Sequence, residues 1–84
     1  MWSQEKAAEL GAVLRRRRAE RGLSQESLAY QAGITKNQLQ LIESARSTGR
    51  KDSPGPSNPR MATLVGLAEV LEVSVAELMA DAGL

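Results

Sequence analysis

The sequence contains no cysteine and no histidine. Without cysteine there is no disulfide framework, which fits a reducing compartment such as the cytosol. Without either residue type, a Cys/His metal site is excluded, and so is catalysis by a nucleophile that a histidine activates. We therefore predict no catalytic residues, no metal ligands and no cofactor.

Three sequence patterns are missing as well. No glycine-rich phosphate loop is present. The N-terminal stretch MWSQEKAAELGAV has no long apolar run, so we expect neither a signal peptide nor a membrane span there. No alternating apolar and polar run is bounded by turn residues, so there is no candidate strand. These absences predict an all-α, non-enzymatic protein of the cytoplasm.

The length and the charge distribution are informative together. Eighty-four residues predict one small domain, residues 1–84, with a single core. Residues 1–60 hold all 11 basic residues and six acidic ones, a balance of +5, whereas residues 61–84 hold four acids and no base, a balance of −4. This asymmetry favours a nucleic acid or a membrane surface as partner of the basic part, although an uneven surface without a partner is the alternative.

Helical spacing of apolar residues predicts the first helix from about Ser3 to Arg21, ended by Gly22. Ser24 caps a second helix, QESLAYQA, and Gly33 supplies the turn that follows it. The inward residues of these two helices are Leu10, Val13, Leu14, Leu28, Ala29 and Ala32.

A third helix begins at Thr35, which forms a T-x-x-Q capping box with Gln38. Only the tripeptide Ala32-Gly33-Ile34 separates it from the second helix. Two short helices joined so closely must cross at a steep angle, and this predicts a helix-turn-helix.

The next stretch, ARSTGRKDSPGPSNP from Ala45 to Pro59, has three prolines, two glycines and no large apolar residue. It predicts a long flexible loop, mobile from Ser47 to Asn58 without DNA. A fourth helix is predicted from about Pro59 or Arg60, and a capping box of Ser74 and Glu77 opens a fifth. The inward residues of these two helices are Leu64, Leu67, Ala68, Leu71 and Leu78.

Two runs, LSQESLAYQAGITKNQLQLIE and PRMATLVGLAEVLEVSVAEL, together resemble the helix-turn-helix domain of lambdoid phage repressors and Cro proteins, the xenobiotic-response-element class of bacterial regulators. The matching positions are Gln25, Leu28-Ala29, Gly33, Leu39, Ile42-Glu43, Pro59, Leu64, Leu67-Ala68, Leu71, Val73 and Leu78. The resemblance implies a compact five-helix, lambda-repressor-like fold. The loop after the third helix departs from it, being about ten residues longer than the family pattern.

The outward face of the third helix carries the side chains that we expect to bind DNA. Asn37 and Gln40 can bind adenine through two hydrogen bonds, Lys36 can reach guanine, and Leu41 can contact the methyl group of thymine. Thr35 and Ser44 are short donors suited to phosphates at the two ends of the helix. A solvated helix face of the same composition is the alternative.

Further DNA contacts are expected around this helix. Gln25 lies in the first turn of the second helix, where backbone N–H groups favour a phosphate. The resembling repressors use this glutamine against the DNA backbone, where it supports a base contact; a polar helix start is the alternative. The remaining phosphate contacts that we predict, with solvated side chains as the alternative for each, are Arg46, Arg50, Lys51 and Arg60.

One arginine of the run RRRR, residues 15–18, is predicted to face the core. Arg18 follows Leu14 by four residues, and Glu43 follows Leu39 by four, so both charges fall on inward stripes. We expect them to form an ion pair, because an unpaired buried charge is costly. The resembling repressors pair arginine and glutamate at the matching positions. The alternative is that both side chains reach solvent, and we expect the other three arginines to be surface charges.

These observations predict a sequence-specific transcriptional regulator, repressor-like and nucleoid-associated. By resemblance it binds double-stranded DNA as a homodimer on a two-fold operator. The fifth helix and the C-terminus are the expected dimer surface, with Val75, Met79 and Leu84 available to it. Two alternatives remain: the antitoxin of a toxin–antitoxin pair, whose toxin binds the acidic C-terminal half, and a protein–protein adapter that retains the fold.

Overall fold

The computed structural model describes residues 1–47 and 55–84. These residues form five helices and no strand, as the sequence predicts. The helices are α1 (Gln4–Glu20), α2 (Gln25–Ala32), α3 (Lys36–Glu43), α4 (Met61–Leu71) and α5 (Val75–Asp81). The part of the predicted mobile loop between residues 48 and 54 lies outside the described residues.

Local sequence signals determine where most of the helices begin. Ser3, Ser24, Thr35 and Ser74 each precede a helix, and each side-chain oxygen accepts a hydrogen bond from a backbone N–H in the first turn. Both predicted capping boxes are present. The start of α4 differs, because its preceding residue, Arg60, makes no side-chain cap. The first N–H groups of α4 therefore receive no hydrogen bond from the side chain of the preceding residue.

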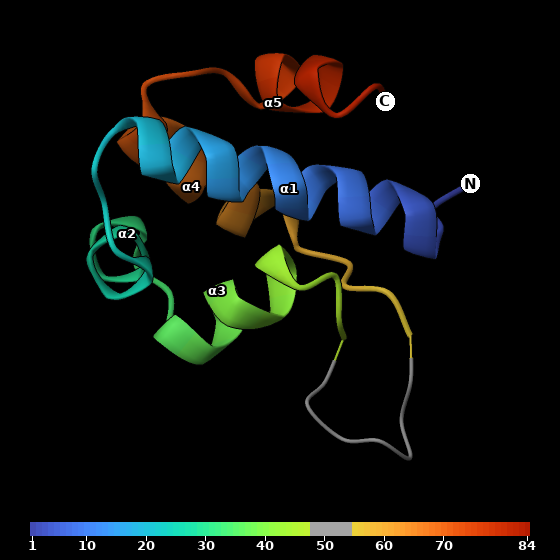
Figure 1. Ribbon diagram of the computed structural model, residues 1–84, viewed down its shortest axis with the longest axis horizontal. Helices are drawn as coiled ribbons and strands as arrows, with labels where there is room; N and C mark the ends of the chain where they lie inside the picture. The colour runs from blue at the N-terminus through green and yellow to red at the C-terminus, as the bar shows by residue number, and fades with distance from the viewer. Residues whose placement is uncertain (48–54) are drawn as a thin grey trace.

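The long helix α1 lies between two layers (Figure 1). It packs against α5 on one side and against α3 on the other, while α2 contacts both α3 and α4, and α4 contacts α5. The shared core is aliphatic. Its largest fully buried members are Leu10, Leu14, Leu28, Leu39, Leu67 and Leu78. Ala32, expected to be inward, is partly buried at the edge of this core.

Two glycines allow helices to approach closely. A Cβ atom at Gly11 would lie 2.7 Å from the carbonyl oxygens of both Ile42 and Glu43, so α1 meets the end of α3 almost backbone to backbone. A Cβ atom at Gly66 would lie 2.7 Å from the carbonyl oxygen of Ala32, which brings α4 equally close to the end of α2. Both glycines thus fix the position of the α2–α3 pair against the rest of the fold.

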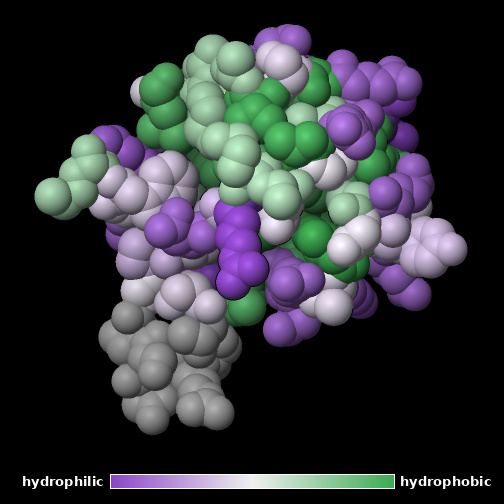
Figure 2. All heavy atoms as spheres, turned by 180° about the vertical axis from the view of Figure 1, so that it is seen from behind, coloured by the Kyte–Doolittle hydropathy of each residue, from purple (hydrophilic) through white to green (hydrophobic). Residues whose placement is uncertain are grey.

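The surface is divided by polarity. Seen from the side opposite to Figure 1, apolar side chains cover much of the upper surface and polar ones lie towards the lower edge and the sides (Figure 2). The exposed face of α4 contributes to the apolar character, since Met61 and Val65 are 63% and 40% exposed. No helix within residues 1–47 and 55–84 is long and apolar enough to cross a membrane.

Candidate nucleic-acid interface

The unit formed by α2 and α3 is held at a fixed angle by a short turn. Gly33 ends α2 in the left-handed conformation, with φ of 78°, which favours a residue without a side chain. The N–H of Ile34 then donates to the carbonyl of Ala29 at 3.0 Å, and Thr35 begins α3 directly afterwards. The helix-turn-helix predicted from the sequence is therefore present.

The two faces of α3 differ sharply in burial. Leu39, Ile42 and Glu43 are buried against α1 and α2, as the helical spacing predicts. The opposite face exposes Lys36, Asn37 and Gln40, and Leu41 is partly exposed at its border. The amides of Asn37 and Gln40 have no protein partner among the hydrogen bonds of the described residues, so both are available to a ligand.

Two polar residues at the ends of α3 already form hydrogen bonds within the protein. The hydroxyl oxygen of Thr35 accepts from Gln38 N at 3.0 Å, and its own proton remains available. The hydroxyl of Ser44 donates to the carbonyl oxygen of Gln40 at 2.8 Å. Ser44 must give up this bond before it can donate to a phosphate, a competition that the sequence does not indicate.

A charged cluster joins α1, α2 and α3 beneath this surface. Arg18 Nε donates to Glu43 Oε2 at 2.8 Å and its Nη2 donates to Glu43 Oε1 at 3.1 Å, so the contact is bidentate. The Glu43 side chain is 2% exposed and the Arg18 side chain 19%. Arg18 Nη1 also donates to the carbonyl oxygen of Leu23 at 3.0 Å. The carboxylate and the guanidinium therefore satisfy each other at the junction of the three helices.

Gln25 is the third member of this cluster. Its amide nitrogen donates to Glu43 Oε1 at 2.9 Å, and the side chain is only partly exposed. In this structure the amide points to the inner carboxylate, whereas the sequence and the resemblance predict a contact with the DNA backbone. Its position at the start of α2 is as expected; the acceptor on α3 is the feature that the sequence analysis missed.

A groove of about 480 Å³ lies next to α3, between its C-terminal half and the start of α4. Its lining includes Gln38, Leu41, Arg46, Asn58, Arg60 and Thr63. Arg46 and Arg60 are exposed, and within the described residues neither forms an ion pair. The described part of the lining contains two arginines and no acid, so the groove favours an anion. The other two predicted phosphate contacts, Arg50 and Lys51, lie outside the described residues.

Three further arginines in or directly after α1 form ion pairs within the molecule, whereas Arg15 is exposed, as predicted. Arg17 and Arg16 both pair with Asp81 of α5, and Arg21 pairs with Glu72 at 3.1 Å. The hydrogen bond with Asp81 raises the pKa of Arg17. Part of the charge asymmetry between residues 1–60 and 61–84 therefore reflects attraction between α1 and the C-terminal helices rather than a partner.

The residues expected at the dimer surface differ in their exposure to solvent. Val75 and Met79 are partly buried and pack against the core, whereas Leu84 is 43% exposed. Core packing thus accounts for much of the apolar surface that Val75 and Met79 would have offered.

The comparisons with known proteins agree with this geometry. Residues 9–80 match the family described as helix-turn-helix domain. The structure is similar to the crystal structure of the clp gene regulator ClgR from Corynebacterium glutamicum, with 27% sequence identity and a TM-score of 0.74 over 93% of this chain and 72% of that one. A comparison with curated protein sequences finds no match. Since the family match spans most of the sequence, the chain belongs to the helix-turn-helix family of DNA-binding regulators.

Proposed function

We propose that this chain is a sequence-specific transcriptional regulator that binds the major groove of double-stranded DNA with α3. The observation that carries the proposal is the exposed amide face of α3, on a helix whose opposite face is held by the core and by the Arg18–Glu43 pair. A major groove accepts one α-helix, and its base edges present the donors and acceptors that amide side chains match.

Each exposed side chain of α3 has a distinct proposed role. Asn37 and Gln40 contact base edges, with adenine as the preferred partner, and Leu41 contacts a thymine methyl group. Lys36, near the start of the helix, reaches a guanine or a phosphate. These four side chains carry the sequence discrimination.

The phosphate contacts come from both sides of α3. Arg46 and Arg60 supply cations from the groove next to its C-terminal half. Arg50 and Lys51 are proposed contacts from the same part of the sequence, and Thr35 donates at the start of the helix. The backbone N–H groups in the first turn of α2, which begins at Gln25, are a further proposed phosphate contact. Such contacts orient the protein on DNA without reading the sequence.

We further propose that the protein acts in the cytoplasm as a repressor-like homodimer. A two-fold operator with half-sites about one helical turn apart would place an α3 in each of two successive major grooves. The end of α5 and the C-terminus, with Leu84, form the proposed contact. We do not propose the antitoxin alternative, because Asp81 pairs with Arg17 of α1 and Glu72 pairs with Arg21, the residue after α1.

Selection of bound sequences from a random DNA pool tests this proposal most directly. We expect a two-fold consensus, with affinity that falls with salt at a slope of about −4 to −5 in log K against log salt for each protomer, corresponding to about five phosphate contacts. Sedimentation of the free protein and of its complex with the selected site measures the stoichiometry. Absence of binding at low salt, or binding with no salt dependence, would remove the DNA-binding assignment.

Variants then separate base contacts from phosphate contacts. Asn37→Ala or Gln40→Ala should weaken the selected site by about 1–3 kcal/mol and leave non-specific binding almost unchanged. Arg46→Ala should weaken all sequences alike. Ala76→Gln, on the exposed face of α5, serves as the control. If the Asn37 and Gln40 variants rank DNA sequences as the parent does, a different face of the protein enters the groove.

A further inference from the structure

The chain between α3 and α4 is closed at its base by two backbone hydrogen bonds. Ser47 N donates to Gly55 O at 3.1 Å, and Ser57 N donates to Ala45 O at 3.2 Å. We call the two paired segments, residues 45–47 and 55–57, the neck. The neck connects the end of the proposed recognition helix to the segment that leads into α4, and Arg46 lies within it.

The backbone of the neck is held in a costly conformation. Ala45 has a φ of 62°, a left-handed conformation that disfavours any residue with a side chain. Ser57 is 4% exposed, and its hydroxyl has no hydrogen-bond partner among the described residues. Such features persist only where surrounding contacts impose them.

The end of α3 supplies some of those contacts: Ala45 N donates to Ile42 O at 3.1 Å and Arg46 N donates to Leu41 O at 2.9 Å. Two further contacts come from the N-terminal residues, far away in the sequence. Trp2 Nε1 donates to the carbonyl oxygen of Ser57 at 2.6 Å, and Gln4 Nε2 donates to the carbonyl oxygen of Ala45 at 2.9 Å. One donor therefore holds each segment of the neck. Figure 1 shows the segment before α4 passing below the N-terminal end of α1.

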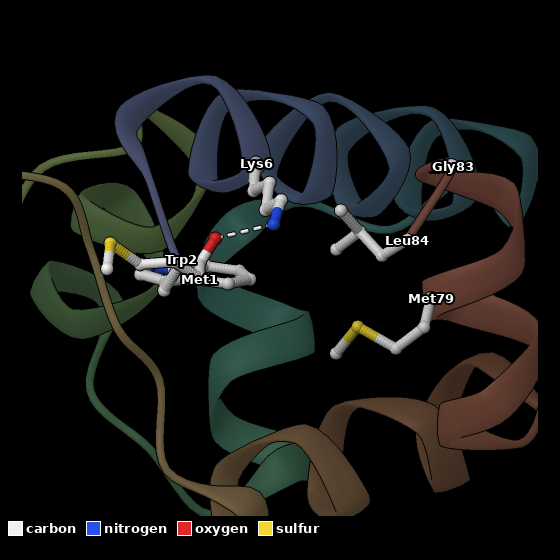
Figure 3. A pocket seen from close by; sticks show the side chains of 6 residues that line it. All are labelled: Met1, Trp2, Lys6, Met79, Gly83 and Leu84. Atoms are coloured by element: carbon white, nitrogen blue, oxygen red, sulfur yellow. Dashed lines mark hydrogen bonds between the residues drawn. The ribbon is translucent and has the colours of Figure 1, made fainter.

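Both donors belong to a well-fixed part of the chain. Ser3 caps α1 by accepting from Lys6 N, which sets the direction of the residues before the helix, and Gln4 is the first residue of the helix itself. The Trp2 side chain packs against the core, and it also lines a pocket together with Lys6, Met79 and Leu84 (Figure 3). These contacts place Trp2 and Gln4 next to the two segments of the neck.

We propose that Trp2 and Gln4 are positioning residues for DNA binding: they hold the neck so that Arg46 and Arg60 point into the groove beside α3. Arg46 lies in the neck, and Arg60 follows Ser57 by three residues at the start of α4. Neither Trp2 nor Gln4 contacts DNA in this arrangement. The proposal rests on the proposed function, because it assigns these two arginines to phosphates.

The test uses Trp2→Phe, which keeps the ring and removes the N–H donor, and Gln4→Met, which keeps the length and removes the amide. The double variant should bind the selected operator roughly tenfold more weakly, with a salt slope shallower by about one, and should rank DNA sequences as the parent does. Ala8→Met, at an exposed site on α1, is the control and should bind as the parent does. Binding is measured well below the melting temperature of every variant.

The same double change is then made in an Arg46→Ala/Arg60→Ala background. There it should alter the affinity by less than about twofold, because the contacts it positions have already gone. An equal loss in both backgrounds would mean that Trp2 and Gln4 act through general stability, and no loss in either would mean that they do not position the arginines. Both results overturn the proposal.

Amide exchange in the free protein tests the positioning role of Trp2 and Gln4 without DNA, and therefore independently of the proposed function. The N–H groups of Ser47 and Ser57 should exchange faster in the double variant than in the parent, while that of Leu14 in α1 should not. Unchanged exchange of Ser47 and Ser57 would refute the positioning role even if the parent binds DNA. Failure of the parent to bind DNA while the exchange rates change would instead refute the proposed function.

Discussion

Replacing Glu43 by alanine removes the acceptor at the centre of the cluster that joins α1, α2 and α3. The carboxylate accepts two hydrogen bonds from Arg18 and one from Gln25. Loss of one partner of a buried pair costs about 3–5 kcal/mol because the other charge is left without compensation. Arg18 keeps its bond to the Leu23 carbonyl, and its side chain is 19% exposed, so we expect the lower end of this range.

A loss of about 3 kcal/mol would be a large part of the stability of this domain, which should lie at roughly 4–12 kcal/mol for 84 residues. The melting temperature should fall by about 12–24 °C. Urea denaturation followed by circular dichroism measures the free energy of unfolding, and a thermal scan measures the shift. Arg16→Ala is the control: its partners Glu20 and Asp81 are at 3.6 Å and 3.9 Å, and its side chain is 58% exposed. Asp81 also keeps its pair with Arg17, so the cost should stay below about 0.5 kcal/mol.

The double variant Arg18→Met/Glu43→Leu distinguishes an ion pair from simple packing. It leaves no stranded charge, so it should recover much of the stability that Glu43→Ala loses. The coupling energy from the complete cycle, measured with Arg18→Met and Glu43→Leu separately, should exceed about 1 kcal/mol. A coupling below about 0.5 kcal/mol would refute the reasoning, because two residues in bidentate contact cannot be energetically independent.

Two further predictions concern backbone geometry and capping. Gly11→Ala should destabilise the fold by about 1–3 kcal/mol in urea denaturation, because the new methyl group would lie 2.7 Å from the carbonyl oxygens of Ile42 and Glu43. Ala12→Ser, at a neighbouring exposed site, is the control. Unchanged or increased stability of the Gly11→Ala variant would contradict the close approach of the two helices. Thr35→Ala should cost about 1 kcal/mol in the same measurement, since it removes the side-chain cap of α3. Thr35→Ser keeps a hydroxyl and should retain most of that stability. Equal stability of the alanine and serine variants would show that the cap contributes nothing.

The features predicted correctly from the sequence are those that neighbouring residues determine. A capping serine or threonine acts on backbone within its own first turn, so the starts of α2, α3 and α5 could be read from Ser24, Thr35 and Ser74. Helical periodicity is equally local. It predicts inward positions for Arg18 and Glu43. That the two side chains meet across 25 positions follows instead from the cost of an unpaired buried charge and from the resemblance.

The features that could not be predicted join residues far apart in the sequence. Trp2 contacts Ser57 across 55 positions, and Arg17 contacts Asp81 across 64. No periodic pattern records such a contact, because it depends on how the helices pack. Gln25 shows the same limit across 18 positions: its place at a helix start follows from the local sequence, but the acceptor of its amide depends on where α3 lies.

Because of the paired neck, the distance between α3 and α4 does not depend on the number of residues that connect them. A backbone hydrogen bond joins Ser57 to Ala45, so the end of α3 and the start of α4 should keep their relative position when the number of residues between Ser47 and Gly55 changes. Closing a longer connection costs little additional entropy. We expect this position to accept a peptide tag or a small inserted domain, and we expect related chains to vary in length here while the rest of the fold stays unchanged.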